Sequence, residues 1–179
     1  MESQMKELEL VRPTKHHRDF AEELKQEFFQ NGETVIHGSA LLDQLDYDAW
    51  LDHIRCNGSS DTVKPGWVPA DSFFALRKRD GRIIGMIDIR HNLDNEFLAN
   101  YGGHIGYAVR PGERGKGYAA HMLRMALDQA RRLGLSKVML GCNADNIASM
   151  KTIEKCGGVR TETKACDDGR TMHIFWIEL

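Results

Sequence analysis

Residues 110–120, "RPGERGKGYAA", have the composition of a loop that holds an anion where a helix begins. Gly115 and Gly117 alternate with the cations Arg114 and Lys116, and an apolar helical pattern follows. The first amides of a helix have no partner inside the helix, and their partial positive charge attracts anions. Glycines allow the turn and the close approach of a phosphate, and cationic side chains add donors. The stretch therefore predicts a pyrophosphate-binding loop.

Two common nucleotide-binding motifs fit this loop less well. A Walker P-loop needs Ser or Thr after Gly-Lys, but Gly117 follows Lys116 and Arg110 occupies the position of the first glycine. Gly115, Gly117 and Ala120 match the dinucleotide fingerprint formally, but that motif follows its strand at once, and here residues 110–114 intervene. We therefore expect neither a P-loop nor a dinucleotide-binding unit.

The elements around the loop must position it. "HIGYAVR" precedes the loop as a strand, a helical stripe runs from Ala119 to Ala130, and "KVMLGC" follows as a buried strand. A helix between two such strands is typical of a β-α-β crossover. Residues 105–109 and 138–140 are therefore predicted to be parallel neighbours.

The remaining segments predict hairpins and helices on either side of this unit. Asp80-Gly81 and Asp168-Gly169 each stand between β-rich runs, which indicates hairpins, and helical spacing predicts helices over 14–31, 41–58 and 147–156. The order predicts an α/β fold with a mixed, largely antiparallel sheet, a central parallel β-α-β crossover and helices on both faces. A length of 179 residues favours a single domain over residues 1–179.

Composition excludes several classes of partner. The net charge is -2 and no long basic run occurs, so we expect no nucleic acid. The four cysteines lack a CxxC spacing and the histidines lack an HExxH motif, so we expect reduced thiols and no metal. The N-terminus is polar and the apolar stretches are short, so we expect no membrane span and a cytoplasmic location.

Two motifs together resemble a known family. Arg114, Gly117 and Ala119 match the R-x-x-G-x-A signature of the GNAT superfamily of acyl-CoA-dependent N-acetyltransferases, and "NIASMKTIEKCGG", residues 146–158, is similar to that family's Asn-containing helix. The resemblance implies a GNAT-type fold, acetyl-CoA as the cofactor and an amine-bearing acceptor. It also implies that a homodimer is possible, because dimers are frequent in the family.

The resemblance also implies which residues bind the cofactor. The main chain of Tyr107 and Val109 would face the thioester and the pantetheine, and the loop would hold the pyrophosphate. Asn146 would reach the cofactor and is also a predicted helix cap. The predicted cofactor-binding residues are Tyr107, Val109, Arg114, Gly115, Lys116, Gly117, Tyr118, Ala119, Asn146 and Ser149.

The acid and base of the reaction are less well defined by the resemblance. The base is predicted to be His104, with Glu96 or water as alternatives, and His104 is alternatively a hydrogen-bonded core histidine. The usual acid of the family is a tyrosine at the position of Ile153, which has no proton to give. Tyr107, Ser149 or water would then assist the thiol, or it leaves as thiolate, so the predicted catalytic residues are His104, Tyr107 and Ser149.

The family's acceptor site implies residues 14–60 and 90–101 as the region that binds the amine. Asp43, Asp46, Asp48 and Asp52 form a local acidic excess there, which suggests attraction of a cationic amine, with a solvated helix face as the alternative. The predicted function is transfer of an acetyl group from acetyl-CoA to a primary amine by direct attack in a ternary complex. The alternative is a catalytically silent acyl-CoA-binding or sensor module.

Overall fold

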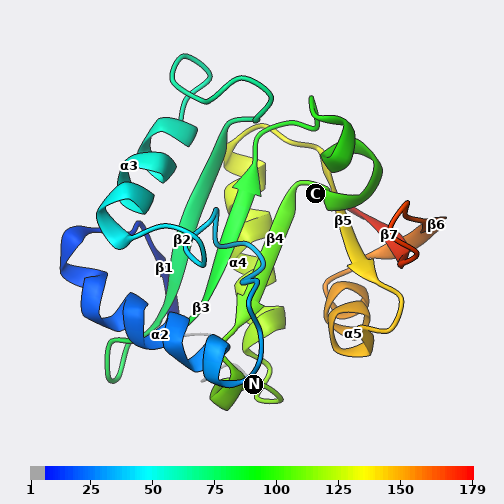
Figure 1. The fold of residues 1–179 in the computed structure, drawn as a ribbon. Helices are drawn as coiled ribbons and strands as arrows, with labels where there is room; N and C mark the ends of the chain where they lie inside the picture. The colour runs from blue at the N-terminus through cyan, green and yellow to red at the C-terminus, as the bar shows by residue number, and fades with distance from the viewer. Residues whose placement is uncertain (1–6) are drawn as a thin grey trace.

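The computed structural model describes residues 7–179. Residues 1–6, the start of the polar N-terminal segment, lie outside the described range. The elements are β1 (Leu8–Val11), η1 (Lys15–His17), α2 (Arg18–Gln30), α3 (Tyr47–Asn57), β2 (Ala70–Arg77), β3 (Arg82–Arg90), η2 (Leu98–Gly102), β4 (Ile105–Val109), η3 (Pro111–Glu113), α4 (Tyr118–Arg132), β5 (Lys137–Asn143), α5 (Ile147–Lys155), β6 (Val159–Ala165) and β7 (Thr171–Glu178) (Figure 1). Within this range, no helix combines the length and the apolar character that crossing a membrane requires.

The first sheet has the strand order β1-β2-β3-β4, and every neighbouring pair is antiparallel. Side chains alternate between its faces, so Phe74 packs with α2 and α3 while Phe73 packs with α4. Helices therefore cover both faces, as the sequence predicts (Figure 1).

The predicted parallel pairing of residues 105–109 with 138–140 is not found among residues 7–179. β5 pairs with β7, and β7 pairs with β6, in a second antiparallel sheet. β4 and β5 meet only at the start of β4, where Gly103 bridges Leu140 and the His104 amide donates to the Met139 carbonyl at 2.7 Å. Beyond this contact the two strands belong to separate sheets.

Gly103 explains why the two backbones come so close at this point. Its φ is +67°, and a Cβ there would lie 2.2 Å from the Met139 carbonyl oxygen. Only glycine accommodates both the left-handed conformation and the contact. The crossing therefore joins the two sheets at one end and leaves them separate at the other.

Local signals in the sequence agree with the structure at the turns and differ at one helix start. Both Asp-Gly hairpins are present, with φ values of +68° at Gly81 and +81° at Gly169. The helix predicted over 41–58 begins instead at Tyr47, because Ala40 and Leu41 have positive φ values and Asp46 caps the helix by accepting the Ala49 amide at 3.0 Å.

Candidate functional site

The loop before α4 presents a row of free main-chain amides. Gly115 and Gly117 have φ values of +75° and +83°, in the left-handed region that glycine adopts without strain. Within residues 7–179, the amides from Gly115 to Ala120 find no acceptor, and His121 is the first to bond, to the Gly117 carbonyl. An anion placed here would receive several N–H donors and the positive end of the helix dipole. The geometry fits a phosphate-binding role.

The two cations of the loop already have acidic partners. Arg114 forms a two-pronged ion pair with Glu33 at 2.8 and 2.9 Å, and its Nε donates to the Val109 carbonyl at 3.0 Å. Lys116 Nζ lies 2.8 Å from the buried carboxylate of Glu113. These side chains brace the loop, so the main-chain amides are its unbonded donors.

A groove of about 510 Å³ runs from this loop along β4 to the start of α5. Nine of the ten predicted cofactor-binding residues line it, and Lys116 does not. The groove also contains Lys151 and Lys155, which the sequence reasoning missed. Within the described part of the chain neither lysine has an ion-pair partner, so α5 supplies free positive charge that Arg114 and Lys116 do not.

The edge of β4 that faces the groove carries unpaired main-chain groups. The Arg90 amide donates to the His104 carbonyl and the Arg110 amide donates to the Ile84 carbonyl, so even-numbered residues of β4 bond towards β3. Because these bonds alternate along an antiparallel strand, Tyr107 and Val109 direct their amides away from β3. The splay between the two sheets leaves those amides on the side of the groove, which Tyr107 and Val109 both line.

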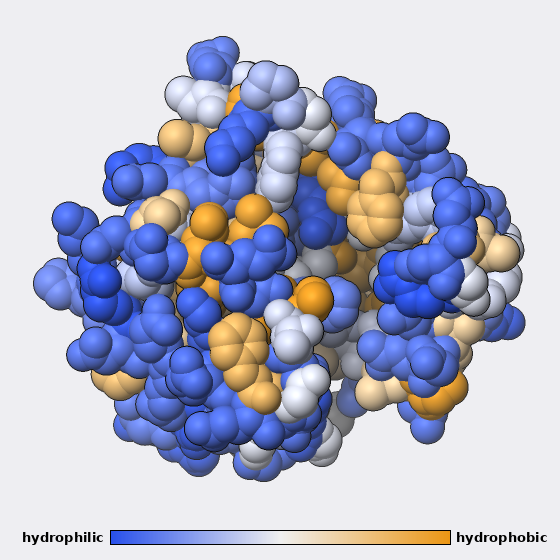
Figure 2. Space-filling model, in the orientation of Figure 1, coloured by the Kyte–Doolittle hydropathy of each residue, from blue (hydrophilic) through white to orange (hydrophobic). Residues whose placement is uncertain are grey.

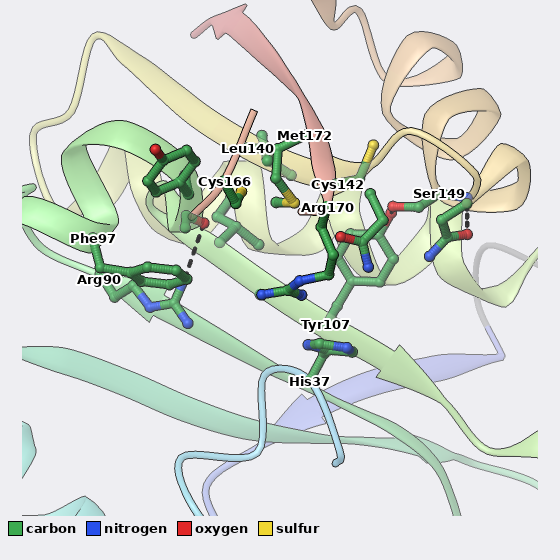
Figure 3. A pocket seen from close by; sticks show the side chains of 17 residues that line it. His37, Arg90, Phe97, Tyr107, Leu140, Cys142, Ser149, Cys166, Arg170 and Met172 are labelled. Atoms are coloured by element: carbon green, nitrogen blue, oxygen red, sulfur yellow. Dashed lines mark hydrogen bonds between the residues drawn. The ribbon is translucent and has the colours of Figure 1, made fainter. Parts of the chain in front are cut away.

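A smaller pocket of about 180 Å³ opens at the splay between β4 and β5 (Figure 3). Figure 2 shows that this face is hollowed between the parts of the molecule built on the two sheets, with apolar residues on both sides of the hollow. The pocket and the groove share four lining residues, His37, Tyr107, Asn146 and Ser149. The two cavities therefore meet at these side chains.

Two of the three predicted catalytic residues lie in contact at this junction. The Tyr107 hydroxyl lies 3.0 Å from the Ser149 hydroxyl. Burial raises the pKa of Tyr107 to about 12, and the hydrogen bond with Ser149 opposes this shift. The Tyr107 hydroxyl thus keeps its proton at neutral pH and is a donor. Asn146 accepts the Ser149 amide at 3.1 Å and is the cap of α5.

The structure does not favour His104 or Glu96 as the base. His104 is 6% exposed, its Nδ1 accepts the Met139 amide at 2.9 Å, and it lines neither cavity. Burial, with a contribution from Arg90, lowers the pKa of His104 to about 4. Glu96 is exposed and also lines neither cavity. The alternative interpretation of His104 as a hydrogen-bonded core histidine agrees better with its surroundings. At the position of the family's usual acid, Ile153 is buried in the core beside α4 and has no proton to give.

His37 is a residue that the sequence reasoning missed. It precedes Gly38, whose φ is +70° and whose Cβ would lie 2.2 Å from the Gly106 carbonyl oxygen. The loop after α2 therefore lies directly on β4, and His37 lines both cavities. No pattern in the sequence indicates that the loop containing His37 and Gly38 belongs to the site. The loop is far from β4 in the sequence, and only the contact between Gly38 and Gly106 brings it there.

The acids that suggested attraction of a cationic amine have structural partners. Asp46 caps α3, Asp48 pairs with Arg18 and Asp52 pairs with Arg55. Asp43 lines a third cavity of about 460 Å³, but it accepts the Ile36 amide at 3.1 Å and the Ser39 hydroxyl at 3.3 Å. The acidic excess in residues 43–52 is therefore explained by capping, ion pairs and loop bonding.

The two sheets splay apart beside strand amides without partners among residues 7–179, and a helix start that fits a phosphate follows. This arrangement fits a nucleotide-linked acyl carrier. A family model described as the acetyltransferase (GNAT) family matches residues 42–158. The chain belongs to this family, and it is an acyltransferase that uses acetyl-CoA. The residues of the groove fit that cosubstrate.

Solved structures of low sequence identity share the fold. The Microcin C7 self immunity acetyltransferase MccE, in complex with acetyl-CoA and AMP, aligns with a TM-score of 0.72 at 15% identity, over 97% of this chain and 93% of that chain. Mutant forms of the spermidine/spermine N-acetyltransferase SpeG from Vibrio cholerae align with a TM-score of 0.67 at 18% identity, over 97% and 94%. No curated protein matches this chain.

Proposed function

We propose that the protein transfers the acetyl group of acetyl-CoA to a primary amine by direct attack within a ternary complex. The observation that carries this proposal is the meeting of two cavities at His37, Tyr107, Asn146 and Ser149. The longer groove has the amides and lysines that suit a nucleotide carrier, and the smaller pocket has room for an acceptor. A donor and an acceptor bound in these cavities would approach each other without leaving the protein.

When bound, acetyl-CoA supplies the reactive thioester. The Tyr107 and Val109 amides would stabilise negative charge on the carbonyl oxygen, a role for which one preorganised donor contributes about 10²–10³ in rate. The Tyr107 hydroxyl, held by Ser149 at 3.0 Å, would donate a hydrogen bond to the departing sulfur. His37, which lines both cavities, would accept the proton that the amine releases.

The state of Cys142 supports direct attack over an acyl-enzyme. This cysteine lines the smaller pocket, but burial raises the pKa of its thiol. A thiol that keeps its proton is a poor nucleophile. Amine acceptors also suit the fold, because the structurally similar SpeG is a spermidine/spermine N-acetyltransferase.

The test is a two-substrate rate study with free thiol as the readout. Intersecting initial-velocity lines and an unchanged intact mass after incubation with acetyl-CoA alone are expected. Parallel lines together with a mass gain of one acetyl group would overturn direct attack. Binding of acetyl-CoA with no release of free thiol in the presence of any amine would instead support the silent binding module.

A further inference from the structure

The smaller pocket has a charge pattern that the amine acceptor alone does not explain. Its charged lining residues are Arg90 and Arg170, and no Asp or Glu lines it. Arg90 comes from the end of β3 and Arg170 from the hairpin between β6 and β7, so the two cations reach the pocket from opposite sheets (Figure 3). A protonated amine by itself would gain nothing from this lining.

In each arginine, some guanidinium nitrogens have acceptors in the protein and one has none among the described residues. Arg90 Nη1 donates to the Gly102 and Gly103 carbonyls at 3.3 and 3.2 Å, and its Nε lies 3.3 Å from Asp88. Its Nη2 lies 3.1 Å from the position that a Cβ on Gly106 would occupy, so it lies over β4 where no side chain projects. Within residues 7–179, that nitrogen has no acceptor.

Arg170 is arranged in the same way. Its Nε and Nη2 both lie 2.7 Å from Asp168, which leaves Nη1 without an acceptor in the described part of the chain. The side chain extends into the pocket between Cys142 and His37 (Figure 3). Two guanidinium groups, each anchored by one carboxylate, thus direct unbonded N–H groups into one small space.

A third lining residue provides an unbonded acceptor. The side-chain oxygen of Asn143 is buried and has no hydrogen-bond partner. A buried polar atom without a partner costs free energy, which a ligand N–H would recover. The pocket therefore offers donors for an anion, and the Asn143 oxygen in its wall is an acceptor that an amine would satisfy once it displaces the atoms that cover this oxygen.

Resting on the proposed function, we propose that the acceptor is a small zwitterionic amine, of the amino-acid class, whose carboxylate binds Arg90 and Arg170 while its amine donates to Asn143. Arginine and carboxylate form strong charge-assisted bonds with matching geometry. At about 180 Å³, the pocket is smaller than those that hold drug-sized ligands, which suits an amino acid better than a polyamine or a peptide.

The neighbouring acids do not favour a polyamine instead. Asp43 and Asp88 line the adjacent third cavity, but both carboxylates are already bonded, Asp43 within its loop and Asp88 to the Ser72 hydroxyl at 2.8 Å and to Arg90. A cationic chain entering there would have to compete with these partners.

The experiment compares acceptors that differ only in the carboxylate. Thiol release is measured with the twenty amino acids, their amides, their decarboxylated amines, acidic dipeptides and spermidine. For the best side chain, kcat/KM for the free amino acid should exceed that for its amide at least tenfold, as expected for a charge-assisted pair. Equal or better turnover of amides or spermidine would overturn the proposal and leave amine acetylation intact.

Variants test whether Arg170 causes the preference. Arg170→Gln, on an exposed hairpin turn, should reduce the ratio of amino acid to amide to near one, mainly through KM, and Arg170→Glu should favour the amide. The matched control is Arg131→Gln, which removes one positive charge from α4 outside every cavity described. An unchanged ratio in Arg170→Gln would overturn the role of Arg170. A preference for acidic dipeptides would overturn the proposal of a free amino acid as acceptor and favour a peptide N-terminus. Absence of turnover with every amine would overturn the proposed function itself.

Discussion

The Tyr107 hydroxyl on β4 lies 3.0 Å from the Ser149 hydroxyl on α5, at the place where the cofactor groove meets the smaller pocket. The first residue belongs to one sheet and the second to the helix that follows the other sheet. Their contact links β4 to α5 beside the splay. The resemblance to the family places its usual tyrosine at Ile153, which is buried in the core, whereas the Tyr107 and Ser149 hydroxyls line both cavities.

Removal of the Tyr107 hydroxyl should slow acetyl transfer. Tyr107→Phe is expected to lower kcat about 10- to 100-fold, at the lower end of what positioned proton donors contribute, while acetyl-CoA binding measured by calorimetry stays within a few-fold. Tyr47→Phe is the control, because the Tyr47 hydroxyl donates to the Thr14 carbonyl far from the groove. An unchanged kcat in Tyr107→Phe would assign thiol departure to water.

His37 and His104 should respond differently to the same substitution. His37→Asn is expected to lower kcat at least 100-fold if His37 takes the amine proton. His104→Asn keeps an acceptor for the Met139 amide and should leave kcat within about threefold, since His104 lines neither cavity. The reverse pattern in steady-state rates would restore His104 as the base.

His104 should also make the protein sensitive to acid. Its folded pKa of about 4 lies below the ordinary value of 6.5, so between these values the unfolded chain binds a proton that the folded chain does not. The contribution of His104 to the free energy of unfolding is therefore complete above pH 6.5. It falls as pH decreases towards 4, by up to about 3 kcal/mol.

Urea unfolding at pH 7 and pH 4.5 measures this effect. His104→Asn should lose less stability than the parent protein over that interval, because asparagine has no charge to bury. Identical losses in the two proteins would show that the acid sensitivity arises at other groups.

Gly117 should be essential for binding the cofactor. Gly117→Glu places a like charge and a side chain where the phosphates would lie, and it forces a residue with φ of +83° to carry a Cβ. Acetyl-CoA binding in calorimetry should be lost. The control is Gly134→Glu at the other end of α4, where φ is +82° and the surrounding space is equally open. Binding retained by Gly117→Glu would place the phosphates elsewhere.

The negative charge of Glu33 should oppose the binding of the anionic cofactor, most strongly at low salt. The hydrogen bond from Arg114 holds the pKa of Glu33 below its usual range against the effect of burial, so this carboxylate stays charged beside the groove. Glu33→Gln is expected to lower the Kd for acetyl-CoA about two- to fivefold, with less effect at high salt. Glu162→Gln removes a similar charge from β6 and should change nothing. Weaker binding in Glu33→Gln would mean that the ion pair positions Arg114 for the phosphates.

The sequence by itself determined the features that depend on neighbouring residues. The two Asp-Gly turns, the cap of α5 and the loop before α4 follow from local preferences, because glycine at positive φ and a free helix start need no distant partner. The motif around Arg114 and Gly117, together with the Asn-containing helix motif over residues 146–158, was sufficient to predict the family and the cosubstrate.

Only the tertiary structure decided how the site is completed. The hydrophobic pattern of residues 105–109 and 138–140 shows that both strands are buried, but it does not say which strands pair, and β5 took β7 as its neighbour. His37, Arg90 and Arg170 come from three segments far apart in the chain, and they line one pocket because Gly38, Gly103 and Gly106 let backbones approach closely. Such contacts depend on the shape of the folded chain and have no periodicity, so no local pattern encodes them.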